Sequence, residues 1–343
     1  MPAGQEKPAF GEAVFRCNFF EPCWTSGVIR VSFLASLGPG YPHSGVHMSS
    51  LLVCFSVLSL LAIVSAREVR AEGSRVTILY DGFGRNPAFV KDWGFSALVE
   101  YAGKRILFDT GNNAAVFAAN VKAAKVDLGK LDFVVISHRH LDHTAGLEHL
   151  LKVNPEVTIY APKEVFGIFG SALPSSFYRK DESLTEHERY FGGRPPEPLK
   201  FGSAWPGAKF VPVDGNLEVA PGVHLISLVS ETPGTKELRE LSLALKTTKG
   251  IVLVAGCSHP GIEKIVEAAA RIDPRVHLVL GGFHMPAAPD DQISKVATAL
   301  HDTWHVERLA PGHCTGEPTF AHFKKVWGAN YGYAGVGSVI DLP

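Results

Sequence analysis

The chain has 343 residues, 46% of them hydrophobic and 20% charged, which suffices for one large domain with a buried core or for two small ones. Its 33 lysines and arginines balance its 34 aspartates and glutamates without any basic tract, so the composition argues against a nucleic-acid partner. The cysteines are odd in number and irregularly spaced, which argues against a disulfide framework; they are Cys17, Cys23, Cys54, Cys257 and Cys314.

The first 47 residues mix proline, glycine and aromatic residues without a sustained period, and they predict no fold. We expect that translation begins at Met48 and that residues 1–47 reflect the choice of start site. A genuine N-terminal extension of unknown role is the alternative.

An apolar run at 51–64 has the length of a signal-peptide core and is shorter than the about 20 residues of a membrane span. Small residues at Ser65-Ala66 and at Ala71 offer cleavage sites, although no positively charged segment precedes the run after the expected start. We therefore expect residues 48–71 to be a signal peptide that directs export to the periplasm or the extracellular space. The alternatives are an uncleaved membrane anchor at 51–66, which alone would bring a membrane contact, and a buried helix in a cytoplasmic protein.

Regular secondary structure is predicted after this segment. A strand at 76–80 precedes a hairpin with strands at 95–101 and 105–108. Asp109 directly follows the hairpin in an Asp-Thr-Gly tripeptide, which on its own indicates an ordinary turn. The segment 112–125 is alanine-rich and has the pattern of a helix.

A cluster of three histidines and one aspartate follows a short apolar strand at 133–136. His138 and His140 are two residues apart, so they leave an extended segment on the same side. Asp142 and His143 come where the chain turns toward the next helix. Imidazole nitrogens and carboxylate oxygens are ligands that zinc and similar divalent metals prefer. The H-x-H-x-D-H pattern on a strand-to-helix loop therefore indicates a metal site rather than a histidine-rich surface loop.

A long segment without clear secondary structure follows the strand predicted at 157–160. Residues from 171 to about 206 mix serine, proline, glycine and charges with several aromatic side chains. So long a segment inside a compact domain is typical of a lid, and its aromatic residues would suit a flat or apolar substrate. A surface excursion that packs its own aromatic residues explains the composition equally well, and we assign no role to His187 within it.

The second half of the chain alternates predicted strands and helices. Strands are predicted at 210–213, 223–226, 241–245, 250–256, 276–280 and 306–310, and helices at 262–271 and 290–301. Across the chain, one histidine follows the carboxyl end of each of four strands: His138, His259, His284 and His313. Strand ends in a layered fold converge on one rim, so these histidines are expected to share a site.

Four motifs carry a family resemblance: Ser-His-Arg-His-Leu-Asp-His-Thr-Ala-Gly-Leu, Gly-Cys-Ser-His-Pro-Gly-Ile, Gly-Gly-Phe-His and Gly-His-Cys-Thr-Gly. From about residue 75 to the C-terminus the chain resembles the metallo-β-lactamase-fold superfamily. Within it, the motifs are similar to the branch labelled 7,8-dihydropterin-6-yl-methyl-4-(β-D-ribofuranosyl)aminobenzene 5′-phosphate synthase-like. The resemblance implies an α/β (α+β) fold over 75–343, a four-layer αββα sandwich of two sheets with helices outside. It also implies that Asp109 supports the metal site from behind the ligands.

We expect a site for two divalent metal ions, with zinc as the first choice and manganese or iron as alternatives. The first metal is assigned to His138, His140 and His259, and the second to Asp142, His143 and His313. The superfamily usually supplies a bridging aspartate after the strand at 251–255, where this chain has Cys257. Cys257 is either a metal ligand or a buried structural thiol, and we favour the thiol. His284 is either a replacement ligand or an acid that contacts substrate, and we favour the acid.

These residues predict a metal-dependent hydrolase in which a metal-bound hydroxide attacks an ester, lactone or phosphodiester of a small-molecule substrate. Asp142 and His284 are the predicted catalytic residues. A transferase of the pterin-synthase type is one alternative, and a non-catalytic metal-bound sensor of small molecules is another. The other histidines lack a motif and are expected to be ordinary surface or packed residues: His149, His224, His277, His301, His305 and His322.

Overall fold

We analysed a computed structural model of the chain, which describes residues 73–343 except 165–170, 198, 202–204 and 206. All of these residues belong to one compact unit, Glu68–Pro343. The extension expected at 1–47 and the signal peptide or anchor expected at 48–71 lie outside the described residues. Within the described part, no helix combines the length and the apolar character needed to cross a membrane.

The larger sheet joins an antiparallel meander to parallel strands. Within the described residues its order is β15 (Val339–Asp341), β1 (Arg75–Tyr80), β2 (Ser96–Tyr101), β3 (Lys104–Phe108), β4 (Phe133–Val135), β5 (Thr158–Pro162) and β8 (Lys209–Val213). The pairs β1–β2 and β2–β3 are antiparallel, which confirms the predicted hairpin. The pairs β3–β4, β4–β5 and β5–β8 are parallel, so the carboxyl ends of these strands share one edge.

The second sheet repeats this change from antiparallel to parallel pairing. Its described order is β14 (Arg308–Gly312), β13 (Val276–Gly282), β12 (Gly250–Ala255), β11 (Arg239–Thr247), β10 (Val223–Val229) and β9 (Leu217–Ala220). Strands β9 to β12 pair antiparallel, whereas β12–β13 and β13–β14 are parallel. The carboxyl ends of β12, β13 and β14 therefore lie side by side.

The central strands of both sheets are buried on both faces, which explains their continuous apolar sequences. In β3, Ile106 and Phe108 pack between the sheets, whereas Leu107 packs toward the outer helices. In β12, Val254 faces the space between the sheets and Leu253 faces the opposite helical layer. Because side chains alternate along a strand, one apolar run supplies two hydrophobic layers.

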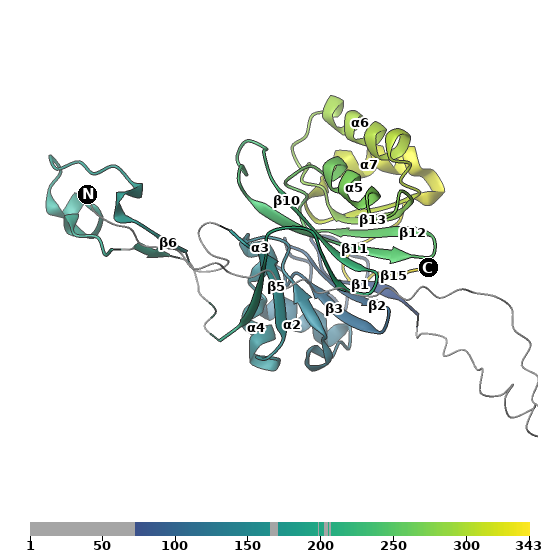
Figure 1. Cartoon of the computed structure of the whole chain (residues 1–343), viewed down its shortest axis with the longest axis horizontal. Helices are drawn as coiled ribbons and strands as arrows, with labels where there is room; N and C mark the ends of the chain where they lie inside the picture. Colours follow the sequence, from purple (N-terminus) through teal and green to yellow (C-terminus); the bar gives the residue numbers. More distant parts are fainter. Residues whose placement is uncertain (1–72, 165–170, 198, 202–204, 206) are drawn as a thin grey trace, which may run out of the picture. The chain divides into compact units, whose positions relative to one another are not determined.

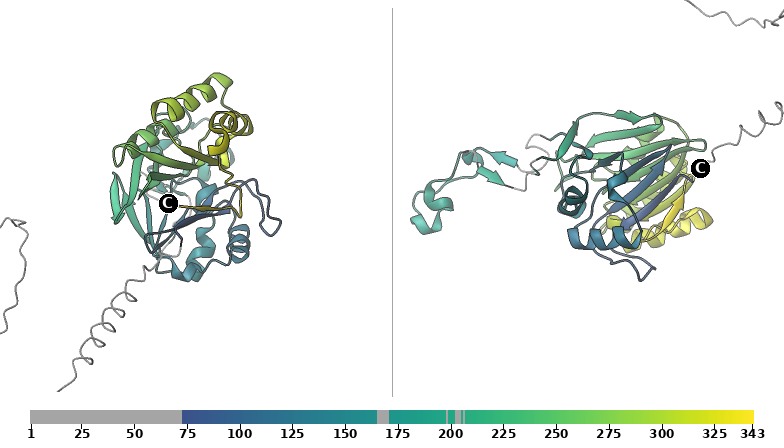
Figure 2. Two further views of the ribbon diagram at one scale, coloured as in Figure 1. Left: turned by 90° about the vertical axis from the view of Figure 1, so that its right-hand side faces the viewer. Right: turned by 90° about the horizontal axis from the view of Figure 1, so that it is seen from below.

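Helices cover the outer face of each sheet. α2 (Ala114–Ala123) and α4 (Leu147–Val153) pack on the larger sheet, and α5 (Ile262–Ala270), α6 (Asp290–Thr298) and α7 (Glu317–Trp327) pack on the second (Figure 1, Figure 2). Asn113 begins α2, because its side chain accepts hydrogen bonds from the backbone N–H groups of Ala115 and Val116 at 2.9 and 3.2 Å. The four layers confirm the predicted αββα sandwich.

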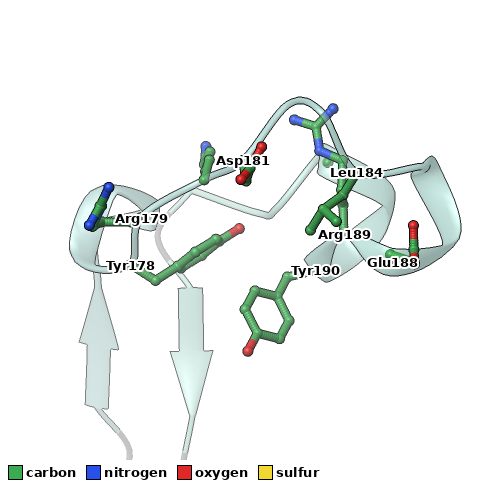
Figure 3. Close-up of a pocket in the computed structure, with 9 residues that line it drawn as sticks. Tyr178, Arg179, Asp181, Leu184, Glu188, Arg189 and Tyr190 are labelled. Atoms are coloured by element: carbon green, nitrogen blue, oxygen red, sulfur yellow. The ribbon is translucent and has the colours of Figure 1, made fainter.

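The segment predicted as an unstructured lid contains a small hairpin of its own. β6 (Ser171–Leu173) and β7 (Leu199–Phe201) pair antiparallel as a separate sheet. Between them, Tyr178 and Tyr190 pack edge to face with ring centroids 5.1 Å apart and line a pocket of about 100 Å³ (Figure 3). The insertion therefore packs some of its own aromatic residues, as the second interpretation of its sequence expected, and the lid function stays a prediction.

Candidate metal centre

Four strand ends place the motif residues at one rim of the two sheets. β4, β12, β13 and β14 each lead into a loop whose first histidine was predicted for the site: His138, His259, His284 and His313. A hydrogen bond of 2.8 Å from the Leu241 N–H to the Ser137 carbonyl joins the two sheets beside these loops. The convergence predicted from the sequence is therefore present.

The first cluster consists of His138, His140 and His259, the residues assigned to the first metal. The His138 Nε2 atom lies 3.0 Å from His140 Nδ1 and 3.3 Å from His259 Nε2. One ligand atom from each residue lies within 4.8 Å of the others. The helical turn α3 (Leu141–Thr144) starts directly after His140, so the chain turns away immediately behind this ligand.

The second cluster consists of Asp142, His143 and His313, the residues assigned to the second metal. The Asp142 Oδ2 atom lies 3.6 Å from His143 Nε2 and 3.4 Å from His313 Nε2. The Cys257 Sγ atom lies 3.2 Å from His143 Nε2 and 3.4 Å from His313 Nε2. Cys257 thus faces the second cluster, at the position where the resemblance implied a bridging aspartate.

A further group, which we call the sulfur cluster, consists of Cys257, His284 and Cys314. The two sulfur atoms lie 3.4 Å apart, and one potential ligand atom from each of the three residues lies within 4.8 Å of the others. The His284 side chain hydrogen-bonds Cys314, which raises its pKa although partial burial opposes the shift. The His284 ring also lies 4.1 Å from the His259 ring, which joins this cluster to the first.

Asp109 supports two of the ligands through hydrogen bonds, the role that the resemblance implied for it. Its Oδ2 atom lies 2.7 Å from His143 Nδ1, and its Oδ1 atom accepts the Ser137 N–H at 2.7 Å. The Ser137 hydroxyl donates to Asp109 Oδ2 and lies 2.9 Å from His138 Nδ1. In this network the Nδ1 atoms of His138 and His143 carry the protons and donate them to Ser137 and Asp109. Their Nε2 lone pairs therefore face the clusters.

Two buried carboxylates fix the loops that carry the remaining ligands. Glu240 accepts hydrogen bonds of 2.7 to 2.9 Å from the backbone N–H groups of Cys257, Ser258 and His259. Asp81 accepts the His313 N–H at 2.9 Å, and burial raises its pKa to about 7 although the charge of His313 opposes the shift. Each carboxylate satisfies backbone donors that would otherwise be buried without a partner.

The backbone is strained at several site residues. Asp109, Ser258, His284 and His313 have φ angles of 57°, 65°, 50° and 47°, in the left-handed region that side chains other than glycine rarely adopt. Such strain persists only where the surrounding contacts determine the conformation. The contacts of Asp109 and His313 described above are of that kind.

The donor set of the first cluster fits a divalent cation. Burial lowers the pKa values of His138 and His140, and it lowers the pKa of His259 to about 3, so the imidazoles stay neutral at pH 7. Neutral imidazoles keep the lone pairs that bind metals. The His259 Nδ1 atom is buried without a hydrogen-bond partner, and its Nε2 atom points toward the other two rings. An ion at their common point would accept all three lone pairs.

The second cluster fits a cation for an electrostatic reason. Burial opposes ionisation of Asp142, but the hydrogen bond from His313 and the nearby charge of His143 hold its pKa well below the usual range. For His313, burial is outweighed by the Cys314 thiolate and Asp142, which raise its pKa to about 10. The cluster therefore stabilises positive charge next to a carboxylate, and a metal ion would take the place of that proton.

The remaining polar residues near the rim and the histidines without a motif lie outside the clusters. Arg139 points away from the clusters and pairs with Glu164. Within the described residues, none of the histidines without a motif joins a group that could hold a metal. His277, for example, is buried and its Nδ1 atom lies 2.7 Å from Glu307.

Three residues of the site were not predicted, and two of them, Cys314 and Glu240, had a signal in the sequence; the third is Asp81. Cys314 stands in the Gly-His-Cys-Thr-Gly motif, where a soft ligand beside His313 was a signal available in the sequence. Glu240 stands at the start of the apolar stretch of β11 and is 1% exposed. An acidic residue that enters a buried strand needs partners, and this was the signal for its role.

Comparisons with known proteins agree with this geometry. Residues 104–219 match the model of the beta-lactamase superfamily domain. The 7,8-dihydropterin-6-methyl-4-(beta-D-ribofuranosyl)-aminobenzene-5′-phosphate synthase of Methanocaldococcus jannaschii is 32% identical over 255 residues, which cover 70% of this chain and 86% of that protein. Ribonuclease Z of Thermococcus kodakarensis is 30% identical over 96 residues, which cover 26% of this chain and 30% of that protein.

One solved structure is similar over almost its entire length. Tm1679, described as a metal-dependent hydrolase of the beta-lactamase superfamily, superposes with a TM-score of 0.59 and 26% identity. The match covers 78% of this chain and 99% of Tm1679. The chain therefore belongs to the beta-lactamase superfamily, with the metallo-β-lactamase fold and in the branch that resembles the M. jannaschii synthase.

Proposed function

We propose that the protein is a metal-dependent hydrolase of an ester, a lactone or a phosphodiester. The observation that carries the proposal is the convergence of the first and second clusters, each a set of three nitrogen or carboxylate donors, at one rim of the sandwich. The similarity to Tm1679, a metal-dependent hydrolase by its description, supports it.

The residues of the clusters would have different roles in such a reaction. When bound, two divalent cations supply a nucleophile by lowering the pKa of water from about 15.7 toward 7, and they neutralise charge that develops on oxygen. The first cluster would hold one of these cations through neutral nitrogens, and His143 and His313 would help to hold the other. Asp142 is ionised and partly exposed, so it would bind a cation and accept a hydrogen bond from the attacking water. The hydrogen bond of His284 with Cys314 raises its pKa, which suits an acid, and His284 would serve as a ligand only after losing that proton.

The test combines elemental analysis of the purified full chain with an activity panel. We expect about two metal ions per chain, fewer in His140→Ala and in Asp142→Ala, and an unchanged content in His322→Ala, a control outside the clusters. The panel contains a nitrophenyl ester, an acyl lactone and bis(nitrophenyl) phosphate, and turnover should fall with the metal content. Metal retention without any turnover would contradict the hydrolase and favour a non-catalytic sensor.

A transferase is the second candidate, because the relative that is 32% identical over most of its length is a synthase by name. Incubation with a dihydropterin and 4-(β-D-ribofuranosyl)aminobenzene 5′-phosphate would test it, with mass spectrometry to detect a conjugate. Export stays a prediction and bears on this choice, since an exported protein would not meet cytosolic precursors. Fractionation and the mass of the mature chain would decide whether residues 48–71 are removed.

A further inference from the structure

We propose that the sulfur cluster, Cys257, His284 and Cys314, is a third cation position that selects thiophilic ions such as Cd²⁺, Zn²⁺ or Cu⁺. It shares the Cys257 sulfur with the second cluster, so that sulfur would bridge two ions when both positions are filled. The proposal concerns ion binding alone and does not depend on the hydrolytic function.

The spacing of the two sulfur atoms suits a shared ion. The Cys257 and Cys314 Sγ atoms are 3.4 Å apart, and neither residue forms a disulfide. A disulfide would bring them to about 2.05 Å. Two thiolates bound to one tetrahedral zinc, each at about 2.3 Å from it, lie between about 3.5 and 4 Å apart. The observed separation is near the second arrangement and far from the first.

The backbone leaves space for the Cys314 sulfur. A side chain at Gly282 would place its Cβ atom 2.9 Å from Cys314 Sγ and 2.4 Å from the Gly256 carbonyl oxygen. The Gly-Gly-Phe-His motif thus ends β13 with residues that allow this sulfur to approach the strand end. The two cysteines are 3% and 2% exposed, so water does not compete freely for them.

The loop that carries His284 is tied to the loop that carries Cys314. The Met285 N–H donates to the Cys314 carbonyl at 3.0 Å, and the Phe283 N–H donates to the Thr315 hydroxyl at 3.1 Å. These bonds flank His284 on both sides and hold it in its left-handed conformation, with φ of 50°. The imidazole is therefore positioned beside the sulfur by its neighbours rather than by chance.

Exposure and ligand chemistry define how the position would be used. His284 is exposed whereas both sulfurs are buried, so an ion would enter past the imidazole and reach the sulfurs last. Thiolate ligands prefer Cu⁺, Zn²⁺ and Cd²⁺ over Mg²⁺ and Mn²⁺. The sulfur cluster would therefore favour thiophilic ions more strongly than the nitrogen and carboxylate ligands of the other two clusters do.

The test is a Cd²⁺ titration of the full chain with Cys17, Cys23 and Cys54 replaced by serine, so that only two thiols contribute. We expect an ultraviolet thiolate-to-cadmium band that Cys314→Ser reduces by about half, because one of two thiolates is lost. His284→Ala should weaken Cd²⁺ binding at least severalfold, and His322→Ala should change nothing. Absence of the band, or a band that Cys314→Ser leaves unchanged, would overturn the proposal.

A second measurement needs no variant at the sulfur cluster. The ¹¹³Cd NMR shift reports how many sulfur atoms bind an ion, and we expect one signal typical of two sulfur donors. Cd²⁺ should also protect both cysteines from alkylation in peptide mapping by mass spectrometry. Signals with at most one sulfur donor, or a disulfide between the two cysteines in freshly purified chain, would contradict the site even if Cys314→Ser fails to fold.

Discussion

At the scale of single residues, Asp109 illustrates how one buried carboxylate prepares several ligands. Its two oxygens accept hydrogen bonds from the Ser137 N–H, the Ser137 hydroxyl and His143 Nδ1. Asp109→Asn keeps the size and tolerates the left-handed backbone, but it turns an amide N–H₂ toward these donors. We expect metal affinity to fall about 10- to 100-fold in competition with a chelator.

The matched control for that variant is Asp132→Asn. Asp132 also accepts a backbone N–H, from Arg105, and a side-chain donor, Lys104, but it does so away from the clusters. Its metal affinity should equal that of the unmodified chain. An equal affinity in Asp109→Asn would show that Asp109 does not orient His143 for binding.

For Glu240 we predict a loss of folding stability rather than of metal affinity alone, because its partners are backbone groups. Glu240→Ala leaves three buried N–H groups without acceptors, at about 1–3 kcal/mol each. We expect the free energy of unfolding in denaturant titrations to fall by about 3 kcal/mol or more. Glu240→Gln keeps one acceptor and should lose less. The exposed pair of Glu148 with Lys152 gives the control, since Glu148→Ala should leave the free energy of unfolding almost unchanged.

The ligands that sequence reasoning found and the two buried carboxylates that it missed differ in one physical respect. Three of the ligands lie close together in a motif of residue types that bind metals, which made them predictable from the sequence: His138, His140 and Asp142. Glu240 and Asp81 act through backbone donors more than 15 residues away, at Cys257 to His259 and at His313. No local pattern encodes such contacts, because they depend on how the strands pair.

At the scale of secondary-structure elements, close strand approach sets the geometry of the rim. Gly281 pairs with Ala255 where β13 meets β12, and it has φ of 107°. A Cβ atom at Gly281 would lie 2.0 Å from the Ala255 carbonyl oxygen. We expect Gly281→Ala to lower the free energy of unfolding by more than about 2 kcal/mol in denaturant titrations, since strain and overpacking add.

Gly103→Ala separates these two contributions. Gly103 has φ of 74° in an open turn, where an added Cβ would meet nothing within 4 Å. Only the backbone cost, roughly 1–2 kcal/mol, applies there. A loss in Gly281→Ala no larger than in Gly103→Ala would mean that β12 and β13 separate at little cost.

Elements buried on both faces were predictable, and marginal elements were not. The continuous apolar runs of β12 and β13 are stable only when buried, so the sequence alone predicted where these strands lie. β9 and β15 are short edge strands whose side chains are mostly exposed, and tertiary pairing alone defines them. α7 was also missed, although Thr319, Phe323 and Trp327 recur every four residues on its buried face.

At the scale of the whole molecule, the two sheets share the ligands. The loop after β4 belongs to the larger sheet and supplies His138, His140 and the second-cluster residues Asp142 and His143. Strands β12 and β14 of the second sheet lead to His259 and His313. Each of the two clusters therefore combines ligands from both sheets, and an ion bound in either would link them as a crosslink does.

This arrangement couples ion binding to global stability. An ion that binds only the folded chain stabilises it by about 2.7 kcal/mol at a free concentration 100 times its dissociation constant. For a domain of this size, that corresponds to roughly 5–10 °C in Tm. We expect a chelator to lower Tm by that amount in scanning calorimetry, and Zn²⁺ to restore it. His140→Ala combined with Asp142→Ala should start at the lower Tm and respond to neither reagent. Equal Tm values for the metal-loaded and chelator-treated chain would show that ions bound at the rim do not link the sheets, because binding across them cannot leave unfolding unchanged.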